Sequence, residues 1–520
     1  MKVQVVVIGL LLVVVLGVPF VLSAGKTGSS HDKDLRTLII VTPHVPQIRD
    51  EFARGFAAWH AREFNEEVSI DFRTPGGTSE IRKQLSAMFK ESVKKLTSSG
   101  NWTIEEGGLL PEGTIPFDLM FGGGSYDHAQ LISGVSVDVT LNESASNTTK
   151  MTLEVPISRP MNFTQAELDA MFGENAIGPQ ELYDPNQYWI GNALSSFGIV
   201  YNRDVFEKLD LPEPTAFVDL TQPALWGWIA LADPRQSGSI TTTFDSILGN
   251  EGWEQGWRTL RGMCGNTRYF TNSSTKPPID VSQGEAAAGL AIDFYGRGQA
   301  QVVKDSGGGD RVGYSDPAGA VYVDADPISI INGGPDFELA TRFVRYLMTD
   351  EAQALWQFDT SRDDNPIGSD GEPMGPHWHA LRRMPVKRSM YLQYFDQFVD
   401  QVDPFEIVSD VKNPGWRTGV QVMMGCFGID IANECRGAYR ALNDAIASGE
   451  FSEAELAELD ALYYAFPETE IEGEMVPFTP ETFRTVRDEW RTRQAELEIE
   501  YTKFYRANYN EIVKRVRERL

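Results

Sequence analysis

Residues Thr37–Phe72 read TLIIVTPHVPQIRDEFARGFAAWHAREFNEEVSIDF, and this stretch decides the fold class. The continuous apolar run at Thr37–Thr42 is typical of a strand that is covered on both faces of a sheet. Alternating apolar residues at Val68–Phe72 predict a second strand. The segment between them carries apolar residues at helical spacing, namely Ile48, Phe52, Phe56 and Trp59. A strand, a helix and a strand joined by short loops predict an α/β protein with a parallel, doubly wound sheet.

The same alternation continues outward along the chain. Residues 81–89 repeat the helical spacing, and PFDLMFGGG at Pro116–Gly124 predicts a third strand that ends in glycines. A second strand–helix series begins near Trp189 and runs to about Tyr295, which predicts a second α/β unit. Ligands of such sheets bind beyond the carboxyl ends of the strands.

Two other segments differ in composition and predicted secondary structure. Residues 133–187 are rich in Ser, Thr and Asn and are expected to form an insertion, with one helix opened by a capping box at Thr164 and Glu167. After residue 360 the sequence predicts mainly helices. Ser452 and Glu455 form a second capping box, and Thr479-Pro480-Glu481 opens a long, charged last helix.

Composition narrows the class of protein. The chain has 520 residues, a formal net charge of −28 and 42% hydrophobic residues, which are values of a globular protein with more than one domain. An acidic chain with no concentrated basic surface argues against binding of nucleic acid. The net charge does not exclude an anionic ligand, because the local field of a pocket can oppose the field of the whole molecule.

The first 24 residues have the layout of a secretory signal peptide. Lys2 precedes an apolar run at Val3–Leu22, small residues follow, and residues 25–34 form a polar linker. We therefore expect export to the periplasm or another extracytoplasmic space, with a mature N-terminus near Gly25. A run of this length can also span a bilayer, so an uncleaved membrane anchor through residues 3–22 stays open.

Cysteines and histidines show no spacing typical of a zinc site or of a hydrolase triad. Cys426 and Cys435 either form a disulfide or remain buried thiols, and Cys264 is left single. His377 and His379 share one face of an extended chain and could hold a metal, although such a pair is more often polar surface.

Three segments place small residues between a predicted strand and a predicted helix. A helix start carries free N–H groups and a partial positive charge, so it binds anions well. Each segment alone is explained by a helix cap and a tight turn, whereas three together favour a ligand site. The sequence lacks G-x-G-x-x-G, GxxxxGK[ST] and G-x-S-x-G, so neither a cofactor nor a catalytic residue is expected. The segments are Gly76-Gly77-Thr78-Ser79, Gly122-Gly123-Gly124-Ser125 and Ser237-Gly238-Ser239.

Five stretches carry a resemblance to a known family: DLMFGGGSYDHAQL, ALSSFGIVYNRD, WIALADPRQSGS, VSQGEAAAGLAIDFYG and AVYVDADPISIINGGPDFELATRFVRYLMTDEAQALW. In the last and most specific one, a strand and Gly-Gly-Pro lead to a helix with one apolar face, and a second helix starts at Thr349. The chain resembles extracellular solute-binding proteins of family 1, the branch that serves ABC importers for ferric iron, phosphonates and sugar phosphates. The resemblance covers about residues 35–395, apart from the insertion.

The resemblance implies a two-lobe periplasmic-binding-protein fold of type II with the ligand in the cleft. Two or three segments should cross between the lobes, with one crossing strand near Leu194–Tyr201 and the return near Val321–Ile331. The expected parts are residues 35–132 and 325–395 for lobe 1, residues 188–324 for lobe 2, and residues 396–520 for a mainly helical C-terminal extension.

The ligand is expected to be a small organic anion, either a phosphorylated or phosphonate compound or a carboxylate. Iron-binding members use adjacent tyrosines, whereas this chain has Phe294 before Tyr295, so one phenolate donor is missing. Ferric iron would need Tyr295, Asp293 and His44 instead. The expected ligand-binding residues are Thr42, His44, Thr78, Ser79, Gly124, Ser125, Tyr126, Ser195, Ser196, Ser237, Gly238, Ser239, Asp293 and Tyr295.

The sequence thus predicts a monomeric substrate-binding protein that delivers a solute to an ABC permease, and not an enzyme. A ferric-iron-binding protein of the same family and a membrane-anchored sensor or scaffold that retains the binding fold stay open. A secreted hydrolase is disfavoured, because the six histidines show no triad motif.

Overall fold

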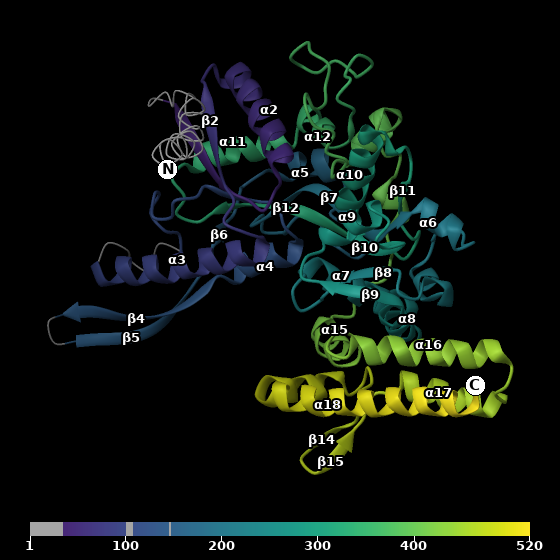
Figure 1. The fold of residues 1–520 in the computed structure, drawn as a ribbon. Helices are drawn as coiled ribbons and strands as arrows, with labels where there is room; N and C mark the ends of the chain where they lie inside the picture. Colours follow the sequence, from purple (N-terminus) through teal and green to yellow (C-terminus); the bar gives the residue numbers. More distant parts are fainter. Residues whose placement is uncertain (1–34, 100–107, 145–146) are drawn as a thin grey trace, which may run out of the picture.

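The computed structural model describes residues 35–99, 108–144 and 147–520 and shows a mixed α/β protein (Figure 1). The expected signal peptide or anchor at residues 1–24, the linker at 25–34 and the mature N-terminus expected near Gly25 lie outside the described residues. Within the described ranges, no helix combines the length and the apolar character needed to cross a bilayer.

The first lobe is a small parallel sheet between helices. Its elements are β1 (Arg36–Val41), α2 (Pro46–Phe64), β2 (Val68–Arg73), α3 (Thr78–Ser99), β3 (Leu119–Phe121), α4 (Ser125–Ser133), α11 (Phe337–Leu347) and α12 (Asp350–Gln357). β1 pairs in parallel with β2 and with β3. Ile48, Phe52 and Phe56 of α2 are buried against this sheet, as their helical spacing predicted. The predicted apolar face of α11 is also buried, and Thr349 caps α12 as expected.

The second lobe repeats this arrangement. Its elements are α6 (Arg203–Lys208), β8 (Ile229–Ala232), α7 (Gly238–Glu251), α8 (Trp253–Asn266), β9 (Thr267–Thr271), α9 (Lys276–Ser282), β10 (Ala288–Ile292), α10 (Asp293–Val303) and β11 (Val312–Ser315). β8 pairs in parallel with β9 and with β10. Ser237 caps α7, because its hydroxyl accepts a hydrogen bond from the N–H of Ile240.

Two long strands, β7 (Ile190–Asn202) and β12 (Val323–Ile331), join the lobes. All 13 residues of β7 and all 9 residues of β12 are buried, and the two strands pair antiparallel with Ser195 opposite Asp324. β12 also pairs with β3, and β7 with β10, so one sheet runs through both lobes in the order β2-β1-β3-β12-β7-β10-β8-β9. These two strands lie where the crossing strands were expected, near Leu194–Tyr201 and Val321–Ile331.

The sheet is mixed and not parallel throughout, which corrects the parallel sheet that the alternation of strands and helices predicted. Pairs within each lobe are parallel, whereas β12 is antiparallel to β3 and to β7, and β7 is antiparallel to β10 and β11. The physical reason is the crossing itself, since a strand that leaves a lobe and the strand that returns run in opposite directions. With that correction, the two-lobe α/β fold class is confirmed.

The segment expected as an insertion forms a long hairpin and one helix. β4 (Val135–Ser144) and β5 (Asn147–Val155) project from the first lobe (Figure 1), and the base of the hairpin packs on α3 in a shared apolar cluster. After β6 (Ser158–Arg159), α5 (Gln165–Phe172) begins with the predicted capping box of Thr164 and Glu167.

Residues 358–416 lead from the first lobe to the C-terminal helices. Their elements are β13 (Met384–Pro385), α13 (Arg388–Tyr394) and α14 (Pro404–Ile407). β13 pairs with β7, with Met384 opposite Leu194. This pairing fixes Arg383 beside a crossing strand.

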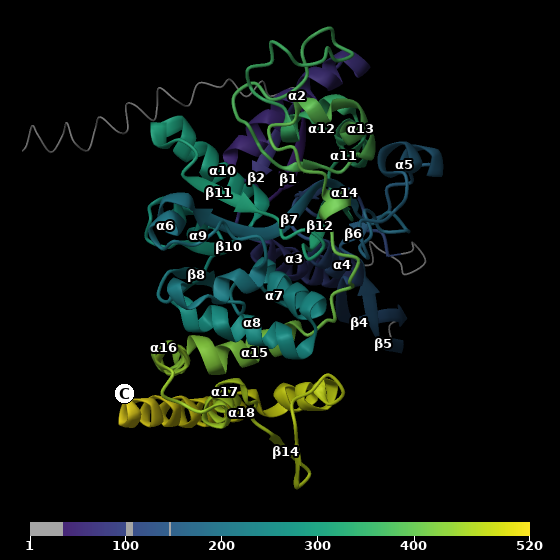
Figure 2. The same cartoon turned by 90° about the vertical axis from the view of Figure 1, so that its right-hand side faces the viewer.

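The C-terminal region is helical and packs beneath α7 and α8 of the second lobe (Figure 2). It contains α15 (Arg417–Met424), α16 (Ala432–Ser448), α17 (Glu453–Tyr464), β14 (Thr469–Ile471), β15 (Glu474–Val476) and α18 (Phe483–Arg519). The capping box of Ser452 and Glu455 is confirmed. Apolar residues of α15, α16 and α18 share one continuous core with α7 and α8, so these helices complete the second lobe.

The cysteines are three buried free thiols. Of the two alternatives for Cys426 and Cys435, the structure shows the thiols and not the disulfide. Burial raises the pKa of both thiols, so they stay protonated and unreactive at neutral pH.

Candidate ligand-binding cleft

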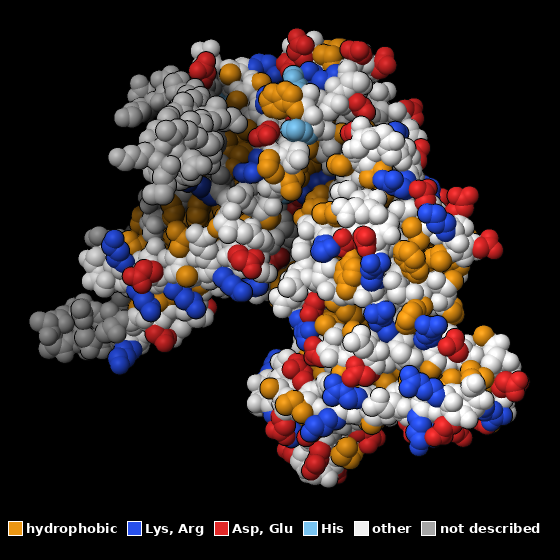
Figure 3. All heavy atoms as spheres, viewed as in Figure 1, with side chains coloured by type: hydrophobic (Ala, Val, Ile, Leu, Met, Phe, Trp, Pro, Cys, Tyr) orange, Lys and Arg blue, Asp and Glu red, His pale blue; other side chains and the backbone are white. Residues whose placement is uncertain are grey.

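The surface is hollowed between the part that carries α3 and α4 and the part that carries α7 and the C-terminal helices (Figure 3). Loops that follow β1 and β3 approach this region from the first lobe, and the starts of α7 and α10 approach it from the second. β7 and β12 pass between them. The cleft therefore lies at the carboxyl ends of the strands, where α/β sheets bind ligands.

The guanidinium of Arg383 is the centre of a polar network between the lobes. It is 3% exposed and forms an ion pair with Asp326 of β12. Its Nη2 donates to Ser195 Oγ of β7 at 2.7 Å, and its Nη1 lies 3.1 Å from His44 Nε2. The ring of Phe294 from α10 lies beneath it, with the ring centroid 4.2 Å from the guanidinium carbon. One cation thus contacts both lobes and both crossing strands.

Pairing sets the charges of the two groups beside Arg383. Burial works to raise the pKa of Asp326, but Arg383, His44 and the N–H of Gly123, 2.7 Å from Asp326 Oδ1, outweigh it and lower that pKa. Burial lowers the pKa of His44, although Asp326 lies 3.0 Å from its Nε2. At neutral pH the network therefore holds an ionised Asp326 and a neutral imidazole.

Asp293, the first residue of α10, is fully buried, and neither carboxylate oxygen has a hydrogen-bond partner among the described residues. Burial raises the pKa of Asp293 to about 7. Burial also raises the pKa of the neighbouring Tyr295 phenol. Asp293 is therefore a buried carboxyl group whose pKa lies near neutrality and whose oxygens have no hydrogen-bond partner among the described residues.

Arg297, one turn further along α10, is held by the protein itself. It forms ion pairs with Asp316 and, at 3.2 Å, with Asp400. Ser196 donates to the other oxygen of Asp316. These groups pair with one another in the wall of the cleft, and Arg297 Nε is buried without a hydrogen-bond partner among the described residues.

The glycines after β3 allow close approach of the first-lobe side chains. Gly122 has φ +94°, and a Cβ there would lie 2.4 Å from His44 Nε2. Gly123 has φ +121°, and its Cβ would lie 2.7 Å from Thr78 Cγ2 at the start of α3. Only glycine permits both the left-handed backbone and these contacts.

Asp324 lies on the floor of the cleft, two residues before Asp326 on the same face of β12. The N–H of Ser125, the first residue of α4, donates to Asp324 Oδ2 at 3.2 Å. Asp324 Oδ1 is buried without a partner among the described residues, and burial raises the pKa of Asp324 to about 6.

The start of α7 forms the second-lobe wall. The hydroxyls of Ser237, Ser239 and Ser274 make a chain, with 3.2 Å between the first two and 3.4 Å between the last two. Arg417 Nη2 donates to the carbonyl oxygen of Gly238 at 3.0 Å. The guanidinium carbon of Arg417 also lies 5.4 Å from the ring centroid of Tyr126 in the first lobe.

The structure brings most of the residues expected from the sequence to this region, and it uses some of them internally. Thr42 Oγ1 donates to the carbonyl oxygen of Phe121 at 2.6 Å and accepts the N–H of His44 at 3.0 Å, so its hydroxyl is occupied. Ser196 is occupied by Asp316, and Ser79 is exposed on α3. The ligand-binding role of the whole set stays a prediction.

Sequence reasoning missed four charged residues of the cleft. Asp324 and Asp326 had a signal, because two acidic residues spaced by two in a buried apolar strand share one face. Arg383 and Arg417 had none, because they lie in or after irregular chain far from their partners in sequence.

The His377/His379 pair gains no support as a metal site. The backbone N–H groups of His377, Trp378 and His379 all donate to the carboxylate of Glu51 at 2.6–2.9 Å. Within the described ranges, no group of three His, Cys, Asp or Glu residues could hold a metal ion.

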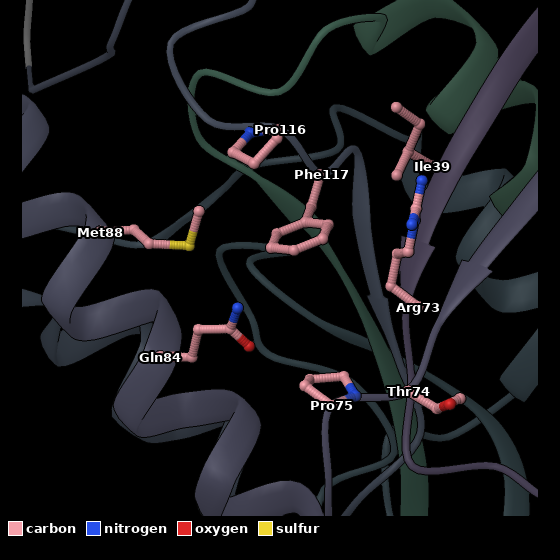
Figure 4. Close-up of a pocket in the computed structure, with 8 residues that line it drawn as sticks. All are labelled: Ile39, Arg73, Thr74, Pro75, Gln84, Met88, Pro116 and Phe117. Carbon is pink, nitrogen blue, oxygen red and sulfur yellow. The ribbon is translucent and has the colours of Figure 1, made fainter.

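A separate pocket of about 580 Å³ opens on the first lobe between α3 and the β1–β2 edge (Figure 4). Met88 and Phe117 face each other across it, and Arg73, Thr74 and Gln84 are its polar side chains. None of the expected ligand-binding residues lines this pocket.

Residues 158–379 match the family model of bacterial extracellular solute-binding proteins. The matched segment includes both crossing strands and the sheet of the second lobe, and it ends before Arg383 and the C-terminal helices. The phosphoglycerate transport regulatory protein PgtC of Salmonella typhimurium is 30% identical over 103 residues, which are 20% of this chain and 26% of that protein. An uncharacterized protein of Haemophilus influenzae is 24% identical over 163 residues, 31% of this chain and 45% of its own. The chain therefore spans less than half the length of the curated relatives it matches.

Two solved structures are similar to part of this chain. Iron-bound HitA from Pseudomonas aeruginosa is 15% identical, with a TM-score of 0.47 over 74% of this chain and 98% of HitA. AfuA from Actinobacillus pleuropneumoniae with bound fructose-6-phosphate is 16% identical, with a TM-score of 0.42 over 62% of this chain and 81% of AfuA.

Proposed function

We propose that this protein is an exported solute-binding protein that captures a small organic anion between its lobes and delivers it to an ABC permease. The observation that carries the proposal is the convergence of arginines, serine hydroxyls and helix starts on the hollow between two lobes that two crossing strands join. The match of residues 158–379 to the solute-binding family supports it. Closure of such lobes around a ligand is a known motion of hinged two-lobe proteins.

The charges in the cleft favour an anion over ferric iron. Iron would need His44, Asp293 and Tyr295, but the Arg383 cation lies 3.1 Å from His44 Nε2 and opposes a second cation there. Burial raises the pKa of the Tyr295 phenol, whereas binding to iron requires a phenolate. Asp293, with a pKa of about 7, is only partly ionised at neutral pH.

The free acceptors favour a ligand that also carries hydroxyl groups. Asp293 and Asp324 each present a buried carboxylate oxygen without a partner among the described residues. A hydroxylated phosphate or carboxylate would bind the arginines through its oxyanion and these acceptors through its hydroxyls. Phosphoglycerate, which the name of the Salmonella relative mentions, has this chemistry, and so do sugar phosphates.

A thermal-shift panel tests the proposal. The full chain is melted with 3-phosphoglycerate, fructose 6-phosphate, phosphonoacetate, citrate or inorganic phosphate, and separately with ferric nitrilotriacetate. A ligand at about 100 times its Kd adds about 2.7 kcal/mol of stability. For lobes of this size the increase in Tm should be about 5–10 °C. We expect at least one organic anion to produce it.

Matched serine variants connect the binding to the cleft. Ser239→Ala, at the start of α7, should weaken the anion, whereas Ser133→Ala, exposed at the end of α4, should not. A rise in Tm and a visible tyrosinate-to-iron colour with ferric salt alone, with no response to any anion, would contradict the proposal and establish the iron-binding alternative.

A further inference from the structure

Arg417 reaches the cleft from the C-terminal helical region, which the family match leaves out. Its Nη2 donates to the carbonyl oxygen of Gly238 at 3.0 Å, and its Nη1 donates to the hydroxyl of Thr242. Both acceptors belong to the first turns of α7 in the second lobe. On the other side, the guanidinium carbon lies 5.4 Å from the ring centroid of Tyr126 in the first lobe. One side chain thus lies between the two walls.

Among the described residues, the charge of Arg417 has no direct counter-ion, because no carboxylate lies within 4.0 Å of its guanidinium nitrogens. Asp127 and Asp245 interact with it only at longer range. Asp245 accepts the N–H of Trp416 at 2.8 Å, and burial raises its pKa to about 6. A guanidinium has five N–H donors, and two of them are used here, one on Nη1 and one on Nη2. Arg417 therefore keeps donors for a further acceptor.

Asp324 supplies the complementary group on the floor of the cleft. It is 8% exposed, and its Oδ1 has no hydrogen-bond partner among the described residues. Ser125, next to Tyr126, donates its N–H to the other oxygen of Asp324. The guanidinium of Arg417 lies over the ring of Tyr126, the residue after Ser125, so Asp324 and Arg417 both approach the start of α4. A cation with free donors and a buried carboxylate with a free acceptor thus share this end of the cleft.

We propose that Arg417 and Asp324 form a two-sided subsite, in which Arg417 binds an oxyanion of the solute and Asp324 accepts a hydrogen bond from an adjacent hydroxyl. The inference rests on the proposed function and names the chemistry of its ligand: a phosphate or carboxylate beside an alcohol. The fork of the guanidinium matches such an oxyanion with two parallel hydrogen bonds, which an ammonium cannot provide. Gly238 and Thr242 hold the fork in place from α7. The C-terminal helices therefore take part in recognition and not only in the core.

Titration calorimetry on the full chain tests the subsite with three probes. These are 3-phosphoglycerate, its analogue 3-phosphonooxypropanoate that lacks the hydroxyl, and inorganic phosphate. If the thermal-shift panel finds a different anion, that anion and its deoxy analogue replace the first two. The variants are Arg417→Gln, Arg417→Lys and Asp324→Asn. Arg491→Gln, an exposed arginine on α18, is the matched control.

We expect Arg417→Gln to weaken the phosphorylated probes by tenfold or more, because it removes a charge-assisted hydrogen bond. Arg417→Lys should recover only part of this loss. Asp324→Asn should weaken the hydroxylated probe and leave the deoxy analogue unchanged, and Arg491→Gln should match the wild type for every probe.

The outcomes separate this inference from the proposed function. If wild-type protein binds an anion and Arg417→Gln binds it equally well, the subsite is wrong and the proposed function stands. If Arg417→Gln does not fold, Arg417→Lys decides, and wild-type affinity in that variant also overturns the subsite. If Asp324→Asn loses the same affinity for the hydroxylated probe as for the deoxy probe, the proposed role of Asp324 is wrong. If wild-type protein binds none of the anions, the proposed function fails and the subsite with it.

Discussion

Replacement of Arg383 by methionine should lower the free energy of unfolding by about 3 kcal/mol. The guanidinium is 3% exposed and pairs with Asp326, which is 2% exposed. Removal of one partner of a buried ion pair costs about 3–5 kcal/mol, because the other charge stays buried without compensation. The lower value applies here, since His44 and the N–H of Gly123 still contact the Asp326 carboxylate.

The double variant separates the ion pair from simple packing. Methionine keeps the apolar stem between Phe294 and Trp356, so little packing is lost. Asp326→Asn alone leaves Arg383 buried and unpaired, and it should destabilise to a similar degree. Arg383→Met combined with Asp326→Asn removes both charges, so it should cost about 2 kcal/mol less than the sum of the two single changes.

Urea unfolding followed by tryptophan fluorescence, together with thermal melts, measures these energies. A loss of about 3 kcal/mol should lower Tm by about 6–12 °C for lobes of this size. Arg515→Met is the matched control, because Arg515 pairs with Glu511 on the exposed face of α18, and its Tm should stay nearly unchanged. Strictly additive single-variant costs in the double variant would refute the reasoning, because they would show that Arg383 and Asp326 do not stabilise each other.

Three further predictions follow from local features. Gly122→Ala should lower Tm and weaken anion binding, because φ of +94° is unfavourable for alanine and its Cβ would lie 2.4 Å from His44 Nε2; a Tm equal to wild type would contradict it. Burial raises the pKa of Asp293 from 3.8 to about 7, so the folded protein holds a proton that the unfolded chain releases, and stability falls by about 1.4 kcal/mol per unit as pH rises from 4 to 7. The stability of Asp293→Asn relative to the wild type should therefore increase over that range and stay higher above pH 7. A constant difference in Tm between pH 4.5 and 7.5 would refute the raised pKa of Asp293. The same exchange at the exposed Asp364 controls for the lost charge. All three cysteines should resist Ellman's reagent in native buffer and react in urea without reductant, and a count of one thiol in urea would show a disulfide.

Local sequence signals predicted the elements that frame the cleft. The capping boxes at Thr164 and Ser452 and the starts of α3, α4 and α7 lie where the sequence placed them. These features are readable because each depends on residues within a few positions of one another. Hydroxyl caps bind N–H groups three residues on, and apolar side chains that recur every turn share one face.

Local sequence patterns did not predict the direction of every strand. Alternation of strands and helices predicted a parallel sheet, which holds within each lobe. The antiparallel pairing of β7 with β12 depends on which strands cross between lobes, and the resemblance to a family, not periodicity, placed those strands. A buried strand has the same apolar pattern whichever way its neighbour runs.

The sequence by itself determined the fold class, the two α/β series and the helix starts that face the cleft. Only the tertiary structure decided which charges occupy it. Arg383 meets His44 from 339 positions away, and Arg417 meets Gly238 from 179 positions away. Tertiary contacts also decide that the hydroxyls of Thr42 and Ser196 bond to protein groups, while Asp293 and Asp324 have carboxylate oxygens without a partner among the described residues. Pairing of side chains depends on where the backbone carries them in space, and neither spacing nor composition records that position.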